Sequence, residues 1–273
     1  MRLLYVSEIV GKPGVFALRH TLRTLRDRFK PDFVLGNGDG ATGGFGLGKN
    51  HAFYLHKLGL QAITLGDCAY YKKDLHPVFE ASSFLLRPAN LPMNSPGRGW
   101  KLFSVGSVRL AVISLLGQTG WSRMYPFQPL LALDDILTRA AGVTPMIVVD
   151  FHAGTTAEKQ LFFSYADGKV SAVVGSHTKV MTGDERISSK GTALLTDAGR
   201  TGSQLSVGGF DPEKEIERLE TGVPLRSVPS WSALAVQGIF IDIDERGHAV
   251  ALETFTESCQ EVPHEPTGND HED

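Results

Sequence analysis

The stretch Phe33-Val34-Leu35-Gly36-Asn37-Gly38-Asp39-Gly40 contains the unit from which this chain is built. A short apolar run predicts a buried strand, and the glycines that follow permit a tight turn. A carboxylate then stands where the strand ends. Other short apolar runs that predict strands cover residues 3–6, 62–65, 109–115, 146–151 and 172–174.

Segments with apolar residues at helical spacing separate these runs. They cover residues 16–29, 50–58, 130–141 and 156–165. This alternation is typical of β-α-β units and predicts a layered α/β fold. After about residue 190 it weakens, and residues 192–196, 235–242 and 248–256 predict antiparallel strands, the last two joined by a turn at 244–247.

Length and composition predict a single large domain. The chain has 273 residues, of which 42% are hydrophobic and 21% charged, which is enough apolar material for a sizeable core. We expect this domain to cover residues 1–257. Residues 258–273 are polar and acidic and include proline, and they predict a disordered tail.

The charge balance and the cysteine content restrict the partners and the compartment. Lys and Arg total 27 against 30 acids, so no overall field attracts long nucleic acid or an anionic membrane. Glu8 interrupts the first apolar run too early for a secretory signal, and no later stretch predicts a bilayer span. With only Cys68 and Cys259 present, a reducing compartment is expected and the predicted location is the cytoplasm.

Five side chains that can bind metals follow predicted strands. They are Glu8, Asp39, Asp67, His152 and His177. Taken singly, each acid is explained by a helix cap or a turn, and each histidine by hydrogen bonding in the core. Because ligands bind beyond the carboxyl ends of strands in open α/β sheets, their joint occurrence predicts one metal site. Carboxylate and imidazole ligands favour Mn, Fe or Zn.

Several motifs along the chain resemble the YmdB-type bacterial metallophosphoesterases. The opening motif is Ser7-Glu8-Ile9-Val10-Gly11-Lys12-Pro13-Gly14, and the second is Asn37-Gly38-Asp39-Gly40-Ala41-Thr42-Gly43-Gly44. Further family-like segments are residues 86–90, 149–153, 172–178, 184–186, 196–199, 201–202 and 221–224. The resemblance implies a calcineurin-like α/β/β/α sandwich, a dinuclear metal centre and hydrolysis of phosphoester bonds, with cyclic nucleotides among the substrates.

The departures from the family pattern cluster at the implied site. Acids are exchanged or replace an amide at Glu8, Asp39 and Asp67, where the family has Asp, Glu and Asn. The other three positions lose a functional side chain: Gly40 replaces an Asn, Cys68 a His and Lys179 a His.

By the resemblance, one metal position keeps four plausible ligands, which are Asp39, Asp67, His152 and His177. The second position would use Glu8, Asp39 and residue 179, but a protonated lysine cannot ligate an ion and repels one. We therefore expect one divalent ion, Mn or Fe, rather than two. Lys179 either substitutes for the second charge or simply points into solvent.

Cys68 and Lys179 occupy catalytic positions of the family, and Gly40 a position that contacts substrate. A thiol replaces imidazole poorly in proton transfer near neutral pH. Cys68 could instead ligate the metal as a thiolate or be a buried small residue, and we favour the buried residue.

Two functions remain in competition. The first is hydrolysis of a phosphodiester or cyclic nucleotide with one metal ion. The second is a catalytically inactive module of the same fold that binds a nucleotide or a protein partner. A third, with Cys68 as nucleophile and His152 as its base, has little support. The predicted partner is a phosphorylated small molecule or cyclic nucleotide, without long nucleic acid or membrane, and assembly into a homo-oligomer stays open.

Overall fold

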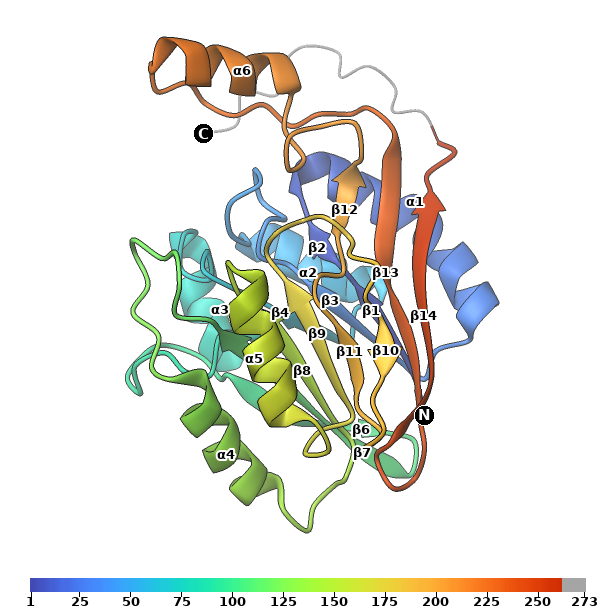
Figure 1. The fold of residues 1–273 in the computed structure, drawn as a ribbon. Coiled ribbons are helices and arrows are strands. Elements are labelled where there is room, and N and C mark those ends of the chain that lie inside the picture. Colours follow the sequence, from blue (N-terminus) through green and yellow to red (C-terminus); the bar gives the residue numbers. More distant parts are fainter. Residues whose placement is uncertain (262–273) are drawn as a thin grey trace.

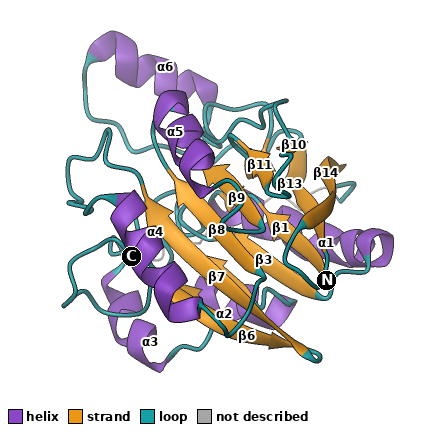
Figure 2. Ribbon diagram, turned by 60° about the horizontal axis from the view of Figure 1, so that its bottom comes forward, coloured by secondary structure: helices purple, strands orange, loops and turns teal. Residues whose placement is uncertain are grey.

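Two β-sheets pack face to face in the computed structural model, and helices cover the outer face of each (Figures 1 and 2). The structure describes residues 1–261. These layers confirm the predicted α/β fold and its α/β/β/α arrangement. Of the predicted tail, residues 262–273 lie outside the described residues, and Ser258 still belongs to the last strand.

The first sheet joins the N-terminal strands to the C-terminal hairpin. Its strand order is β2 (Glu8–Ile9), β12 (Arg200–Ser203), β13 (Leu234–Ile243), β1 (Arg2–Val6), β3 (Phe33–Asn37), β4 (Ala62–Thr64) and β5 (Leu85–Leu86), with β14 (Ala249–Ser258) paired to β13. Strands β1, β3, β4 and β5 run parallel, whereas β13 is antiparallel to both β1 and β14. The predicted C-terminal hairpin is therefore confirmed.

The second sheet consists mainly of parallel strands. Its order is β10 (Arg186–Ile187), β11 (Ala193–Leu195), β9 (Ala172–Ser176), β8 (Ile147–His152), β7 (Val108–Leu116) and β6 (Trp100–Val105). Sequence patterning missed β6, an antiparallel edge strand in which only one residue is buried. An edge strand of this kind has no continuous apolar run.

Helices lie on both outer faces, and the four that were predicted are confirmed. The first sheet is covered by α1 (Gly11–Phe29), α2 (Lys49–Leu58) and α3 (His76–Ala81), and the short helix η1 (Lys73–Leu75) precedes α3. The second sheet is covered by α4 (Pro129–Ala140) and α5 (Thr156–Ala166). Helix α6 (Pro212–Thr221) projects from the body of the molecule (Figure 1). Sequence patterning missed α3 and α6, and α6 has no buried residue. Across residues 1–261, no helix has the length and apolarity required to cross a bilayer, and the cytoplasmic location stays a prediction.

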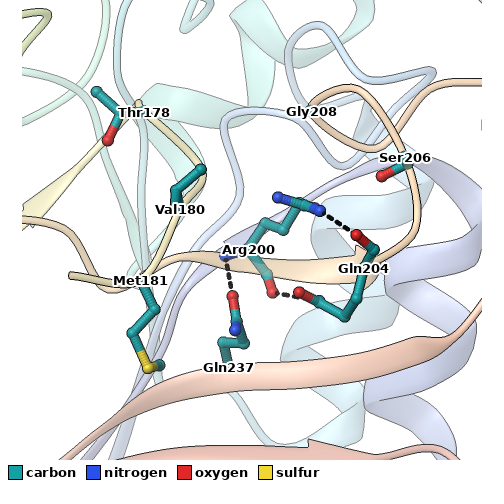
Figure 3. A pocket seen from close by; sticks show the side chains of 8 residues that line it. All are labelled: Thr178, Val180, Met181, Arg200, Gln204, Ser206, Gly208 and Gln237. Carbon is teal, nitrogen blue, oxygen red and sulfur yellow. Dashed lines mark hydrogen bonds between the residues drawn. The ribbon is translucent and has the colours of Figure 1, made fainter. Parts of the chain in front are cut away.

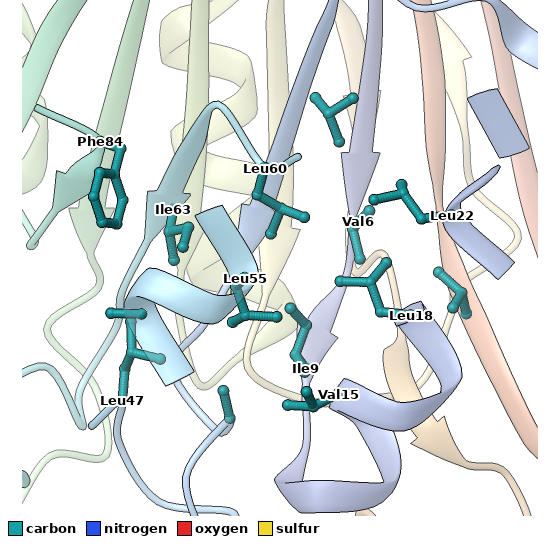
Figure 4. Packing of buried hydrophobic residues seen from close by; sticks show 14 of the residues in the cluster. Val6, Ile9, Val15, Leu18, Leu22, Leu47, Leu55, Leu60, Ile63 and Phe84 are labelled. Atoms are coloured by element: carbon teal, nitrogen blue, oxygen red, sulfur yellow. The ribbon is translucent and has the colours of Figure 1, made fainter. Parts of the chain in front are cut away.

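Three apolar clusters hold the layers together. In the first, Leu18 of α1 and Leu55 of α2 pack against the first sheet with Val6 (Figure 4). The second cluster lies between the sheets and includes Tyr5 and Val148, and the third packs α4 and α5 on the second sheet. Burial on both faces fixes the two sheets against each other, so their strand ends meet at one edge.

Candidate metal centre

The five predicted metal-binding residues lie at the edge where strands of both sheets end. Asp39 and Asp67 follow β3 and β4, His152 is the last residue of β8, and His177 directly follows β9. Glu8 is the first residue of β2. The structure therefore brings together side chains that are up to 169 positions apart in the chain, since Glu8 and His177 share the site (177 − 8).

Three atoms that could bind a metal ion form a nearly regular triangle. Asp67 Oδ1 lies 3.0 Å from His152 Nε2 and 3.4 Å from His177 Nδ1, and the two imidazole nitrogens are 3.1 Å apart. Ligands held about 2.0–2.1 Å from one tetrahedral ion are about 3.3 Å apart, so these spacings fit a shared cation. Asp39 Oδ2 lies 3.7 Å from His152 Nε2, and Asp39 belongs to a second, overlapping group with Asp67 and Cys68.

A hydrogen-bonded chain orients His152 toward the centre. Its Nδ1 lies 2.9 Å from Ser176 Oγ, and Ser176 donates its hydroxyl hydrogen to Asp150 Oδ1 at 2.7 Å. Asp150 also accepts from Tyr5 and Asn37. Because the hydroxyl hydrogen of Ser176 is engaged, His152 Nδ1 is the donor of their bond and Nε2 faces the centre.

Backbone amides hold the carboxylate of Asp39 in place. The N–H groups of Gly66 and Cys68 donate to its two oxygens at 2.6 and 3.1 Å. Gly66 must lack a side chain, because a Cβ there would lie 2.3 Å from Cδ2 of the His152 ring. The loop after β4 thus fixes both an acid and an imidazole of the centre.

Lys179 points into the site and not into solvent. Its ammonium lies 3.0 Å from Glu8 Oε1, and the Glu8 side chain is only 2% exposed. Burial lowers the pKa of Lys179, but the nearby acids Glu8, Asp39 and Asp67 raise it by more than burial lowers it. The pKa is therefore raised overall, and the ammonium stays charged. Glu8 Oε2 is buried and has no hydrogen-bond partner among the described residues, which leaves one acceptor free beside the ion pair.

The loop carrying His177 and Lys179 has an unusual backbone. Both residues have positive φ, 99° and 60°, a region that non-glycine residues rarely adopt. Between them, the backbone N–H and the hydroxyl of Thr178 donate to Asp197 Oδ2 at 2.9 and 2.7 Å. Lys159 pairs with the same oxygen at 2.8 Å, and both partners are fully buried.

These anchors were missed in the sequence. Asp197 lies inside a family-like segment, so its motif was visible without its contact to Thr178. Lys159 lies in the predicted helix 156–165, where a charged residue is expected on the polar face. Asp197 and Lys159 are not adjacent in sequence to His177 or Lys179. Only the folded structure brings them into contact with the loop that carries these two residues.

The acids around the centre favour a positive charge there. Burial lowers the pKa of His152, but the hydrogen bond to Asp67 and the charges of Asp39 and Glu8 outweigh it and raise the pKa to about 9. Burial, with Asp67 and Glu8, raises the pKa of Asp39 to about 7 against the opposing effect of His152. The pKa of Asp67 is lowered despite its burial, because both imidazoles bond to it. A cation would replace the proton on His152.

Cys68 is a buried neutral thiol in this environment. Its side chain is 8% exposed, and Sγ lies 3.6 Å from Asp67 Oδ2. Burial raises its pKa strongly, and the charges of Asp39 and Asp67 add to this. Sγ also lies within 4.8 Å of carboxylate oxygens of Asp39 and Asp67, in a group that could hold a metal ion. The raised pKa opposes a thiolate, whether as a nucleophile or as a ligand, in the absence of a cation.

Gly40 lies against the Lys179–Glu8 pair. A Cβ at this position would lie 3.0 Å from both Glu8 Oε1 and the carbonyl oxygen of Ile9. A side chain at position 40 would therefore require Glu8 and the Ile9 carbonyl to shift by a few tenths of an ångström. The changes at positions 8 and 40 are thus sterically linked.

Trp121 was not singled out in the sequence, yet it covers the imidazoles. Its ring lies 4.9 Å from that of His177 in an edge arrangement and 6.0 Å from that of His152. Its indole N–H donates to the carbonyl of Gly117. Trp121 is one of three aromatic residues in the segment between β7 and α4, and no periodic pattern there marks it as a neighbour of the imidazoles.

Comparisons with known proteins agree with this geometry. A profile of the YmdB-like protein family matches residues 4–255. The 2′,3′-cyclic-nucleotide 2′-phosphodiesterase of Bacillus subtilis (strain 168) is 38% identical over 246 residues, which cover 90% of this chain and 92% of that protein.

Solved structures agree with the sequence match. A phosphatase from Mycoplasma pneumoniae superposes with a TM-score of 0.88 at 28% identity, covering 94% of this chain and 93% of the other. A protein from Thermus thermophilus superposes with a TM-score of 0.87 at 30% identity, covering 94% and 99%. The strand-end acids, the imidazole pair and the two-sheet fold thus have a common explanation, and this chain belongs to the YmdB-like family of calcineurin-like metallophosphoesterases.

Proposed function

We propose that this chain hydrolyses a phosphodiester or cyclic nucleotide with a single divalent ion, Mn or Fe. The ion would be held by Asp39, Asp67, His152 and His177. The observation that carries the proposal is the ion pair of Lys179 and Glu8, which lies in the part of the site where a second ion would bind by family resemblance.

The pair accounts for one ion in place of two. Two unit charges 4 Å apart in a partly screened protein environment interact by about 4 kcal/mol, so a buried ammonium opposes a second cation strongly. Lys179 also engages Glu8 Oε1, one of the oxygens that this cation would need. The four residues proposed to bind the single ion stay available to it, because Lys179 makes no bond to any of them among the described contacts.

The bound ion would supply a Lewis acid and a water molecule with a lowered pKa. The remaining tasks fall to the protein. Ser176 holds His152 with Nε2 toward the centre, and Lys179 offsets negative charge on the phosphoryl oxygens. Cys68, a weak neutral donor, stands where the family has an imidazole, so we expect solvent to protonate the leaving oxygen and turnover to be slow.

The relative from Bacillus subtilis suggests which substrate to test first. Its name describes a 2′,3′-cyclic-nucleotide 2′-phosphodiesterase, and the two sequences match over 90% of this chain. A cyclic 2′,3′-phosphodiester has its leaving oxygen tethered in a strained ring. Such a substrate depends less on a strong general acid than an unstrained diester does, which suits the loss of imidazole at Cys68.

Metal analysis together with turnover tests the proposal. We expect one Mn or Fe ion per chain and Mn²⁺-dependent hydrolysis of a 2′,3′-cyclic nucleotide. His152→Ala should remove both, whereas the matched control His20→Ala, on the exposed face of α1, should change neither. Two ions per chain, or full activity in His152→Ala, would rule the mechanism out.

The loss of an imidazole at Cys68 favours a second candidate, a nucleotide-binding module without chemistry. Its thiol is neutral and weakly acidic, because burial and the nearby acids raise its pKa. Calorimetry that detects binding of the cyclic nucleotide, with one ion present and no product after long incubation, would select this candidate over the hydrolase.

A further inference from the structure

A cavity of about 380 Å³ adjoins the loop that carries Lys179 (Figure 3). Thr178, Val180 and Met181 of this loop line one wall, and Gln204 and Ser206 line another. This volume lies within the range of about 300–1,000 Å³ that is usual for small-molecule sites. None of the metal ligands lines the cavity, so it is separate from the centre described above.

Arg200 is buried at the cavity and has no acidic partner. The residue is 7% exposed, and no carboxylate among residues 1–261 lies within 4 Å of its guanidinium. Among the described residues, its guanidinium donates only to the backbone carbonyls of Lys179, Ser203 and Gln204, at 2.6, 2.7 and 2.8 Å. Since a guanidinium has five N–H groups, these three bonds leave donors unused.

The buried positive charge of Arg200 is expected to have a negatively charged partner. Buried arginines are almost always paired, because carbonyl dipoles satisfy hydrogen bonds without neutralising the charge. The planar fork of a guanidinium also matches the paired oxygens of a phosphoryl group. We propose that the cavity binds the phosphoryl group of a small molecule, with Arg200 as its counter-charge.

The site shares a wall with the Lys179 loop. Arg200 holds the carbonyl of Lys179, and a Cβ on the cavity residue Gly208 would lie 3.9 Å from Lys179 Cδ. An occupant of the cavity therefore contacts the segment that positions the ammonium. The phosphoryl group belongs either to a separate molecule or to the far end of a molecule bound at the metal centre. The cavity does not depend on the hydrolytic function proposed above.

Val180 offers a test that leaves Arg200 in place. Its side chain lines the cavity and is 61% exposed, so substitution should not disturb the fold. We expect Val180→Glu to supply a competing carboxylate and to weaken binding of inorganic phosphate at least tenfold by calorimetry. The neutral control of matching size, Val180→Gln, should bind like the parent. Titrations in the His152→Ala background exclude phosphate bound at the metal centre.

Equal phosphate affinity in Val180→Glu and Val180→Gln would overturn the proposal. Arg200→Gln, which keeps donors but loses the charge, should abolish phosphate binding, with thermal unfolding as the check that it folds. Adenosine 3′,5′-bisphosphate distinguishes the two sources. If one molecule spans both sites, Val180→Glu and His152→Ala each weaken the same single binding event; if a separate molecule binds at the cavity, the event that Val180→Glu weakens is unchanged by His152→Ala.

Discussion

The ammonium of Lys179 lies 3.0 Å from Glu8 Oε1, and the side chains are 20% and 2% exposed. Glu8 is one carbon longer than the Asp of the family motif, and its carboxylate fills the space beside Gly40. The departures at positions 8, 40 and 179 are therefore in contact and form one linked rearrangement. Their shared consequence is a fixed positive charge next to the imidazole pair.

Restoring an imidazole at position 179 should change the metal content. Lys179→His removes the ammonium and adds a ligand beside Glu8, so we expect metal analysis to find two ions per chain in place of one. Lys179→Gln removes the charge without adding a ligand and should stay at one ion. A single ion in both variants would show that Lys179 does not exclude the second.

Metal affinity should rise with pH. The pKa values of about 9 for His152 and about 7 for Asp39 mean that protons compete with the ion at these groups. Each proton released strengthens binding up to about tenfold per pH unit while the group remains protonated. We expect affinity to increase from about pH 6 to about pH 9, across the range in which these two groups lose their protons. Calorimetry in buffers of different ionisation enthalpy measures both the affinity and the protons released, and an affinity that stays flat would contradict the raised pKa values.

Ser176 should matter to the metal without touching it. Ser176→Ala removes the acceptor of the His152 Nδ1–H bond, and loss of such a partner typically costs about 10–100-fold in metal affinity. We expect about tenfold weaker Mn²⁺ binding by calorimetry. Ser164→Ala on the exposed side of α5 is the matched control and should bind normally.

Positions 8 and 40 should show energetic coupling. Gly40→Asn adds a side chain 3.0 Å from Glu8 Oε1 at Cβ alone, and overpacking of this kind costs about 1–3 kcal/mol. Glu8→Asp shortens the obstructing side chain, so the double variant should recover stability relative to Gly40→Asn. Denaturant unfolding of the four proteins measures the coupling, and simple additivity would show that the two positions are independent.

Sequence patterns identified the parts of this fold that bury apolar residues with a clear period. The strands β1, β3, β4, β7, β8 and β9 and the helices α1, α2, α4 and α5 fall in this class. The short strands β2, β5, β10 and β12 do not, because two to four residues are too few to show a period. Helix α6 was missed for a different reason, since none of its residues is buried and no apolar face was imposed on it.

The site was partly predictable for a related reason. Strand ends locate Asp39, Asp67, His152 and His177 at one edge, and family motifs identify the substitutions. Neither source shows that Lys179 turns inward, because this depends on the positive φ of the loop. The contacts of Trp121 with the two imidazoles and of Arg200 with Lys179 join segments far apart in the chain and have no local pattern.

The buried pair beneath the loop should be essential for stability. Lys159 and Asp197 are both fully buried 2.8 Å apart, and Lys159→Met would leave the carboxylate of Asp197 without a cation. Breaking a buried pair in this way typically costs about 3–5 kcal/mol, whereas an exposed pair contributes about 0–1 kcal/mol. Denaturant unfolding should therefore show a large loss for Lys159→Met and little change for Lys190→Met, whose exposed ammonium lies 3.6 Å from Asp167. Because Asp197 also binds Thr178, the first variant should weaken metal binding through His177 as well. Unchanged metal affinity in a folded Lys159→Met protein would show that the loop holds its conformation without this ion pair.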